Sequence, residues 1–148
     1  MSDLRELYQE MIVQHARNPR NFRGLAGGNR TAEGYNPLCG DKVTIQARVE
    51  GGVVREIAFQ GAGCAISTAS ASLMTESLAG KTLEEAEDLF RRFHDLVTGQ
   101  RAGGSEPLGK LEVFAGVSEF PVRVKCASLP WHTMRAALAG EAGAVTTE

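Results

Sequence analysis

Residues 43–59 read VTIQARVEGGVVREIAF, and this stretch decides the fold. Within 43–49, apolar and polar residues alternate, which is the period of a β-strand with one buried face. Gly51 and Gly52 are a signal for a two-residue turn, and 53–59 returns as the partner strand. The stretch therefore predicts an antiparallel hairpin whose apolar face has to be covered by other elements.

Helical patterns surround this hairpin. Apolar residues recur at helical spacing in four segments, at about 4–18, 67–79, 82–97 and 128–138. Ser67 or Thr68 is the expected cap of the second helix. Two stretches rich in glycine and polar residues are expected to be loops, 20–34 and 98–109. A helix, then a hairpin, then several helices indicates an α+β fold with helices gathered on one face of an antiparallel sheet.

Composition excludes several classes of protein. The chain has 148 residues, with 16 Lys and Arg against 18 Asp and Glu, so its formal net charge is −2. A protein that depends on a phosphate backbone is more basic than this, so no nucleic-acid partner is expected. No run approaches the roughly 18 apolar residues that cross a bilayer, and the N-terminus lacks the pattern of a signal peptide. We therefore expect a single cytoplasmic domain, residues 1–148, with no membrane partner and with reduced thiols.

The three cysteines are the chemically informative residues. Cys39, Cys64 and Cys126 are an odd number without Cys-x-x-Cys spacing, which argues against a disulfide framework and a thioredoxin-like redox pair. Any one of them alone is most simply a small buried apolar residue. Each, however, lies in a turn or just ahead of an expected helix, and none falls on an apolar stripe. Functional groups are commonly sited on such connections, so we interpret the three as one functional set.

The local settings of the cysteines favour thiolates and a metal ion. Cys64 and Cys126 each precede an expected helix, whose N-terminus stabilises an anion, and Lys125 adds a neighbouring cation. Asp41 lies two residues after Cys39, so in an extended chain both side chains point to the same side. Three sulfurs and one carboxylate fill a tetrahedron that suits Zn²⁺, and the same set can hold a [2Fe–2S] unit. The alternative is that Asp41 only caps a turn.

Four motifs carry a family resemblance. They are, in chain order, HARNPRNF at 15–22, NPLCGD at 36–41, GAGCAIS at 61–67 and RVKCASL at 123–129. With these motifs in this order, the chain resembles the IscU/NifU-like iron–sulfur cluster assembly proteins, and more closely their SufU branch, from about residue 4 to 138. The resemblance implies a small antiparallel β-sheet of about three strands with helices packed on one face. It also implies that four side chains converge on one exposed metal site: Cys39, Asp41, Cys64 and Cys126.

Two departures from IscU-type scaffolds narrow the implied function. Those scaffolds have a histidine immediately before the third cysteine and a Leu-Pro-Pro-Val-Lys segment that recruits a chaperone. Here Lys125 takes the position of that histidine, and 119–123 reads EFPVR. The inserted stretch 98–109 is also similar to SufU. The resemblance therefore implies a zinc protein with sulfurtransferase-like activity, whose partners are a SufS-like cysteine desulfurase and downstream cluster assembly proteins or apo-acceptors.

Cys39 is the sulfur acceptor that the resemblance implies, because its thiolate can attack the outer sulfur of a donor persulfide. Zinc would keep this thiolate deprotonated and in place. Arg123 and Lys125 are auxiliary candidates for steering the partner or stabilising the transferred persulfide. Two alternatives stay open. One is a scaffold on which the same four ligands hold a transient [2Fe–2S] cluster that is transferred to apo-proteins, and the other is a purely structural zinc module.

Overall fold

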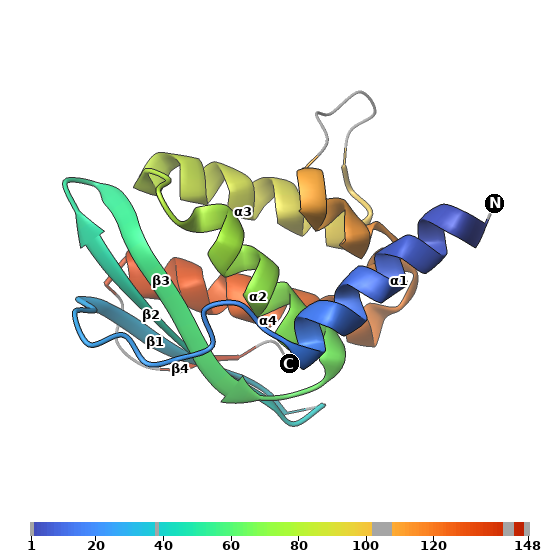
Figure 1. Ribbon diagram of the computed structural model, residues 1–148, viewed down its shortest axis with the longest axis horizontal. Helices are drawn as coiled ribbons and strands as arrows, with labels where there is room; N and C mark the ends of the chain where they lie inside the picture. The colour runs from blue at the N-terminus through green and yellow to red at the C-terminus, as the bar shows by residue number, and fades with distance from the viewer. Residues whose placement is uncertain (1, 38, 102–107, 141–143, 147–148) are drawn as a thin grey trace.

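The computed structural model describes residues 2–37, 39–101, 108–140 and 144–146, and it confirms the expected α+β fold (Figure 1). Three long strands form an antiparallel sheet, and the helices pack on one face of it. The elements follow one another in this order: α1 (Ser2–Arg17), β1 (Arg30–Asn36), β2 (Asp41–Glu50), β3 (Val53–Ala62), α2 (Ala65–Leu78), α3 (Leu83–Thr98), the 3₁₀ helix η1 (Gly109–Glu119), α4 (Pro121–Leu138) and β4 (Ala144–Thr146).

The predicted hairpin forms the centre of the sheet. Strands β2 and β3 pair antiparallel, and Gly51 and Gly52 make the turn with φ of 60° and 74°. Burial alternates along β2 from Asp41 to Val49, as the sequence pattern requires. The strand order is β3-β2-β1-β4, in which the short β4 pairs parallel with β1.

Strand β1 corrects one expectation, because most of its residues fall in the stretch 20–34 that was expected to be a loop. Its buried positions are Ala32, Gly34 and Asn36, which offer almost no apolar side chain for a sequence pattern to reveal. A Cβ at Gly34 would overlap the Thr133 hydroxyl of α4. The glycine therefore serves close packing of the helix on the strand, which weakens the strand signal in the sequence.

Two helices begin earlier than their patterns predicted. Helix α2 begins at Ala65, and its N-cap residue is Cys64. Helix α4 begins at Pro121 rather than near residue 128. Proline suits the first helical turn because its fixed φ is already helical and no hydrogen-bond donor is needed there. As a consequence, Cys126 lies inside α4. The expectation that it lies ahead of this helix was wrong.

The stretch 98–109 is only partly described. Helix α3 ends at Thr98, and Gly99 caps it in the left-handed conformation, with φ of 75°. Residues 102–107 lie outside the described residues, so the expected loop stays a prediction there. The helical segment η1, which begins at Gly109, was not predicted from the sequence.

The core lies between the sheet and the helices α2 and α4. Trp131 of α4 is 1% exposed and stacks on Phe93 of α3, with 4.5 Å between the ring centroids. Ile45 of β2 and Leu73 of α2 are fully buried in the same core. Helix α4 packs against both α2 and the first two strands. This packing fixes the N-terminal parts of α2 and α4 next to the connection between β1 and β2.

Candidate metal centre

Four separate segments meet at one end of the sheet. Cys39 lies in the short connection between β1 and β2, and Asp41 is the first residue of β2. Cys64 is the N-cap residue of α2, and Cys126 lies in the second turn of α4. The packing of α4 on the sheet brings together two cysteines that are 87 positions apart in the chain. We call these four residues the sulfur cluster.

Three of the four ligand atoms of the sulfur cluster, those of Cys39, Asp41 and Cys126, lie at distances that suit one metal ion. Sγ of Cys39 is 3.3 Å from Sγ of Cys126, and the ligand atoms of Cys39, Asp41 and Cys126 all lie within 4.8 Å of one another. Cys64 lies at the edge of this group, with its Sγ 3.9 Å from Oδ2 of Asp41. A tetrahedral zinc ion with Zn–S bonds of about 2.3 Å separates its sulfur ligands by about 3.8 Å. The donor types and their spacing therefore fit Zn²⁺.

The cluster is half-buried, whereas the resemblance implied an exposed site. Asp41 and Cys126 are 2% and 0% exposed, respectively, and form the inner side. Cys39 and Cys64 are half-buried and remain partly accessible to solvent. An approaching group can therefore contact Cys39 and Cys64 but not Cys126.

Asp41 links two elements of the fold. Its Oδ1 accepts a hydrogen bond of 2.8 Å from the backbone N–H of Cys64, which lies 23 positions away at the start of α2. Gly63 allows this contact, because a Cβ there would lie 2.6 Å from the same oxygen. The bond leaves Oδ2 directed toward the sulfurs of the cluster, where it can serve as a ligand.

The electrostatic balance of the cluster favours a cation. Burial, followed by the neighbouring Cys39, Asp41 and Cys64 side chains, raises the pKa of the Cys126 thiol far above its ordinary value of 9.0. The expectation that a helix N-terminus stabilises this thiolate was wrong, because Cys126 lies within α4. A divalent ion held by these residues would favour the deprotonated form of a coordinating thiol. Cys64 does have the predicted helix terminus, since its Sγ accepts from the backbone N–H of Ser67 at 3.5 Å.

Arg123 lies beside the cluster. Its hydrogen bond with Cys126, followed by the charges of Cys64 and Cys39, raises the pKa of its guanidinium above the ordinary value for arginine. Arg123 thus places a permanent positive charge next to all three sulfurs. Lys125 is half-buried on the same helix, and its auxiliary role stays a prediction.

Asn36 is a residue of the site that our sequence analysis missed. It is 0% exposed, and its Nδ2 lies 3.5 Å from Oδ2 of Asp41 and 3.6 Å from Sγ of Cys126. The only signal in the sequence is its place as the first residue of the motif NPLCGD, where it stands immediately before Pro37.

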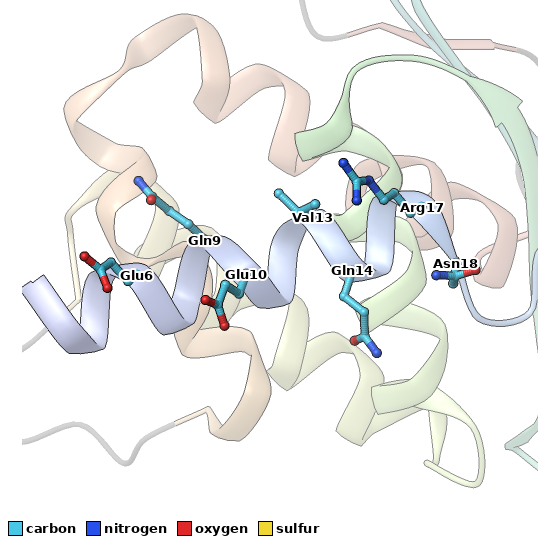
Figure 2. Close-up of a pocket in the computed structure, with 7 residues that line it drawn as sticks. All are labelled: Glu6, Gln9, Glu10, Val13, Gln14, Arg17 and Asn18. Atoms are coloured by element: carbon cyan, nitrogen blue, oxygen red, sulfur yellow. The ribbon is translucent and has the colours of Figure 1, made fainter.

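Two hollows of the surface lie away from the sulfurs. One hollow of about 500 Å³ runs along the outer face of α1 and is shown in Figure 2. Its lining consists of exposed and mainly polar side chains: Glu6, Gln9, Glu10, Val13, Gln14, Arg17 and Asn18. A second one, of about 390 Å³, lies at the start of α3. Neither hollow is lined by a cysteine. In the part of the chain that the structure describes, no helix is both long and apolar enough to cross a membrane.

Comparison with known proteins supports the family resemblance. The model of the NifU-like N terminal domain family matches residues 7–137. The zinc-dependent sulfurtransferase SufU of Bacillus subtilis is 38% identical over 142 residues, which are 96% of each chain. The iron–sulfur cluster assembly scaffold protein IscU of Streptococcus pyogenes is 37% identical over 144 residues, which are 97% of this chain and 90% of that protein.

Solved structures show the same architecture. The iron–sulfur cluster assembly scaffold protein for the SUF system of Fervidobacterium islandicum has a TM-score of 0.83 and 34% identity, covering 90% of this chain and 97% of its own. The N-terminal part of a NifU-like protein from Brucella abortus has a TM-score of 0.80 over 93% of this chain and 95% of its own. At 23% identity it supports the fold alone. The chain therefore belongs to the NifU-like N-terminal domain family, as its four motifs indicated.

Proposed function

We propose that this chain is a zinc-dependent acceptor of persulfide sulfur, which works with a cysteine desulfurase and supplies the sulfur for iron–sulfur cluster assembly in the cytoplasm. The observation that carries this proposal is the arrangement of the sulfur cluster. Two inner donors, Asp41 and Cys126, lie beneath two accessible thiols, Cys39 and Cys64. The four side chains would hold Zn²⁺, and the ion would keep the thiols deprotonated until a donor arrives.

Cys39 is the residue best placed to accept sulfur. It lies on the connection between two strands, followed by Gly40 in the left-handed conformation with φ of 71°. The other three residues are fixed by a strand or a helix, so Cys39 can leave the cluster with the least change elsewhere. Its thiolate attacks the outer sulfur of a cysteine persulfide on the desulfurase. The S–S bond of the donor breaks, the donor cysteine leaves as a thiolate, and Cys39 keeps the transferred sulfur as a persulfide.

Arg123 assists this step through its charge. Its guanidinium lies next to the sulfurs, keeps its charge at every physiological pH, and can pair with a persulfide anion on Cys39. Lys125 is the second auxiliary candidate, one residue before Cys126. Both cations would also attract an acidic surface on the partner.

A scaffold for a transient [2Fe–2S] cluster is the second candidate function. The same four donors suit iron, and a relative named as an IscU scaffold is 37% identical to this chain. Two features favour the zinc-dependent sulfur acceptor over the scaffold. Lys125 stands where IscU-type scaffolds have a histidine, and residues 119–123 read EFPVR.

The experiment combines metal analysis with a persulfide assay. We expect the purified protein to carry one zinc ion, and a cysteine desulfurase with L-cysteine to add one sulfur atom to Cys39, detected by mass spectrometry of the peptide. Cys39→Ser should stay folded by circular dichroism and take up no sulfur. An unfolded Cys39→Ser protein would support a structural zinc module instead. Iron–sulfur absorbance after reconstitution, with delivery to an apo-acceptor and no persulfide on Cys39, would support the scaffold.

A further inference from the structure

We propose that Asn36 is a positioning residue of the metal site, which holds Asp41 and Cys126 in the geometry that the ion requires. This inference rests on the proposed function, since it concerns the same ligands. The side chain of Asn36 reaches both ligands from the inner side of the site, with Nδ2 3.5 Å from the Asp41 carboxylate and 3.6 Å from the Cys126 sulfur.

The fold determines this position of Asn36. It is the last residue of β1 and pairs directly with Asp41, the first residue of β2. Residues that face each other across an antiparallel pair project from the same side of the sheet. Helix α4, which carries Cys126, packs over that side. Asn36 is thus enclosed by the sheet and the helix at the point where the two ligands meet.

Burial makes the contacts of Asn36 important. The residue is 0% exposed, as is Cys126, and Asp41 is only 2% exposed. The carboxamide nitrogen carries two hydrogens and donates to two acceptors, which the carboxylate and the sulfur provide. The backbone carbonyl of Asn36 also accepts the N–H of Cys39 at 3.3 Å. One residue therefore contacts three of the four members of the sulfur cluster.

The chemistry of a carboxamide suits this role. Its N–H₂ group donates to a carboxylate and to a thiolate without competing for the metal, and it has no proton to lose as the pH changes. Donors of this kind partly neutralise two like-charged ligands that lie side by side. They also set the direction of the lone pairs, which is how residues that contact the ligands without binding the metal affect metal affinity.

The test compares Asn36→Leu with a matched control. Leucine has a similar size but no donor, so we expect zinc affinity to fall about 10- to 100-fold when the zinc-loaded protein is titrated with a competing chelator. The visible absorption bands of the cobalt-substituted protein should shift as well, because they report ligand geometry. Asn29→Leu is the control. Its carboxamide bonds to the backbone of Val49 at the opposite end of β2, and its loss should change stability without changing either metal readout.

A measurement on the wild-type protein covers the case in which Asn36→Leu does not fold. In protein loaded with NMR-active cadmium, the side-chain amide protons of Asn36 should show scalar coupling to the metal through the Cys126 sulfur. Absence of this coupling would overturn the inference, and so would zinc affinity within twofold of wild type in a folded Asn36→Leu protein. If the wild-type protein binds neither zinc nor cadmium, the proposed function fails, which is a different outcome.

Discussion

Helix α2 carries two polar clusters that differ in how their charges and hydrogen bonds are balanced. The sulfur cluster lies at its N-terminus, around Cys64. The second cluster lies further along the helix, where α2 meets α1 and the segment after it. We call it the His15 network, and it consists of His15, Arg20, Asn21, Ser72, Thr75 and Glu76.

The His15 network is balanced internally. Nδ1 of His15 is 2.7 Å from the Ser72 hydroxyl, which also accepts the backbone N–H of Arg20 at 2.8 Å. Asn21 donates to the Thr75 hydroxyl at 3.0 Å. The residue types of a hydrolase triad are present in Ser72, His15 and Glu76. Ser72 is 0% exposed, however, so no substrate can reach it. The network therefore fastens α1 to α2.

The sulfur cluster is unbalanced by comparison. It gathers three thiols and a carboxylate, and burial makes the charged form of Cys126 costly. Hydrogen bonds from neighbouring donors, such as the N–H of Cys64 and the amide of Asn36, offset only part of this cost. The comparison teaches that a buried polar cluster which satisfies itself is structural, whereas one that gathers more acidic groups than cations is a candidate for binding a metal ion.

The strongest test of this contrast removes an inner ligand. Cys126→Ala should lower zinc affinity by more than about 100-fold, since losing a ligand costs more than losing an outer contact. Ser72→Ala, in the His15 network, should destabilise the protein by about 1–3 kcal/mol and leave zinc affinity unchanged. Chelator competition and denaturant unfolding measure the two effects. Equal zinc affinity in Cys126→Ala and wild-type protein would show that the sulfurs do not form the metal site.

The central part of this picture could be predicted from the sequence. The alternation and the paired glycines of 43–59 identify the hairpin, because strand period and turn chemistry are local properties. The three cysteines could be grouped from their settings alone, and the family resemblance added the convergence with Asp41. Strand β1 could not be predicted, since Gly34 serves packing against α4 and provides no apolar side chain.

Asn36 could not be predicted for a different reason. Its role depends on a strand register that pairs it with Asp41 and on the position of α4, and both are tertiary properties. The early start of α4 was missed in the same way. Residues 121–125 are exposed or half-buried, so they carry no apolar stripe, and Pro121 is the only local signal for the helix start.

A smaller effect is expected from a change that moves one ligand without removing it. In Gly63→Ala, the added Cβ would lie 2.6 Å from Oδ1 of Asp41, so the carboxylate has to shift. We expect zinc affinity to fall about tenfold, which is within the range for changes to residues that contact the ligands without binding the metal. Gly116→Ala is the matched control, because a Cβ there has open space around it. Isothermal competition with a chelator should separate the two variants, and identical affinities would show that the Asp41 position does not matter for the ion.

The smallest effect concerns the His15 network and its response to pH. Burial, followed by the charge of Arg20, lowers the pKa of His15 below its ordinary value of 6.5. The unfolded chain therefore binds a proton near pH 6.5 that the folded chain still excludes, so stability is fully present above that pH and declines as the pH falls through it. Each such proton contributes at most about 1.4 kcal/mol per pH unit. Burial lowers the pKa of His132 as well, so His15→Gln should remove only part of the slope.

Denaturant unfolding of the zinc-saturated proteins between about pH 7.5 and 5.5 tests this prediction, because the zinc contribution is common to both and cancels in the difference. His15→Gln should lose less stability than wild type over this interval and keep the wild-type zinc affinity at the upper pH. If the stability of wild type and of His15→Gln changed equally with pH, His15 would take up its proton in the folded protein. The network would then not be neutral. A fall in zinc affinity would show instead that the two clusters are coupled along α2, and that the separation between a structural and a metal-binding cluster does not hold for this helix.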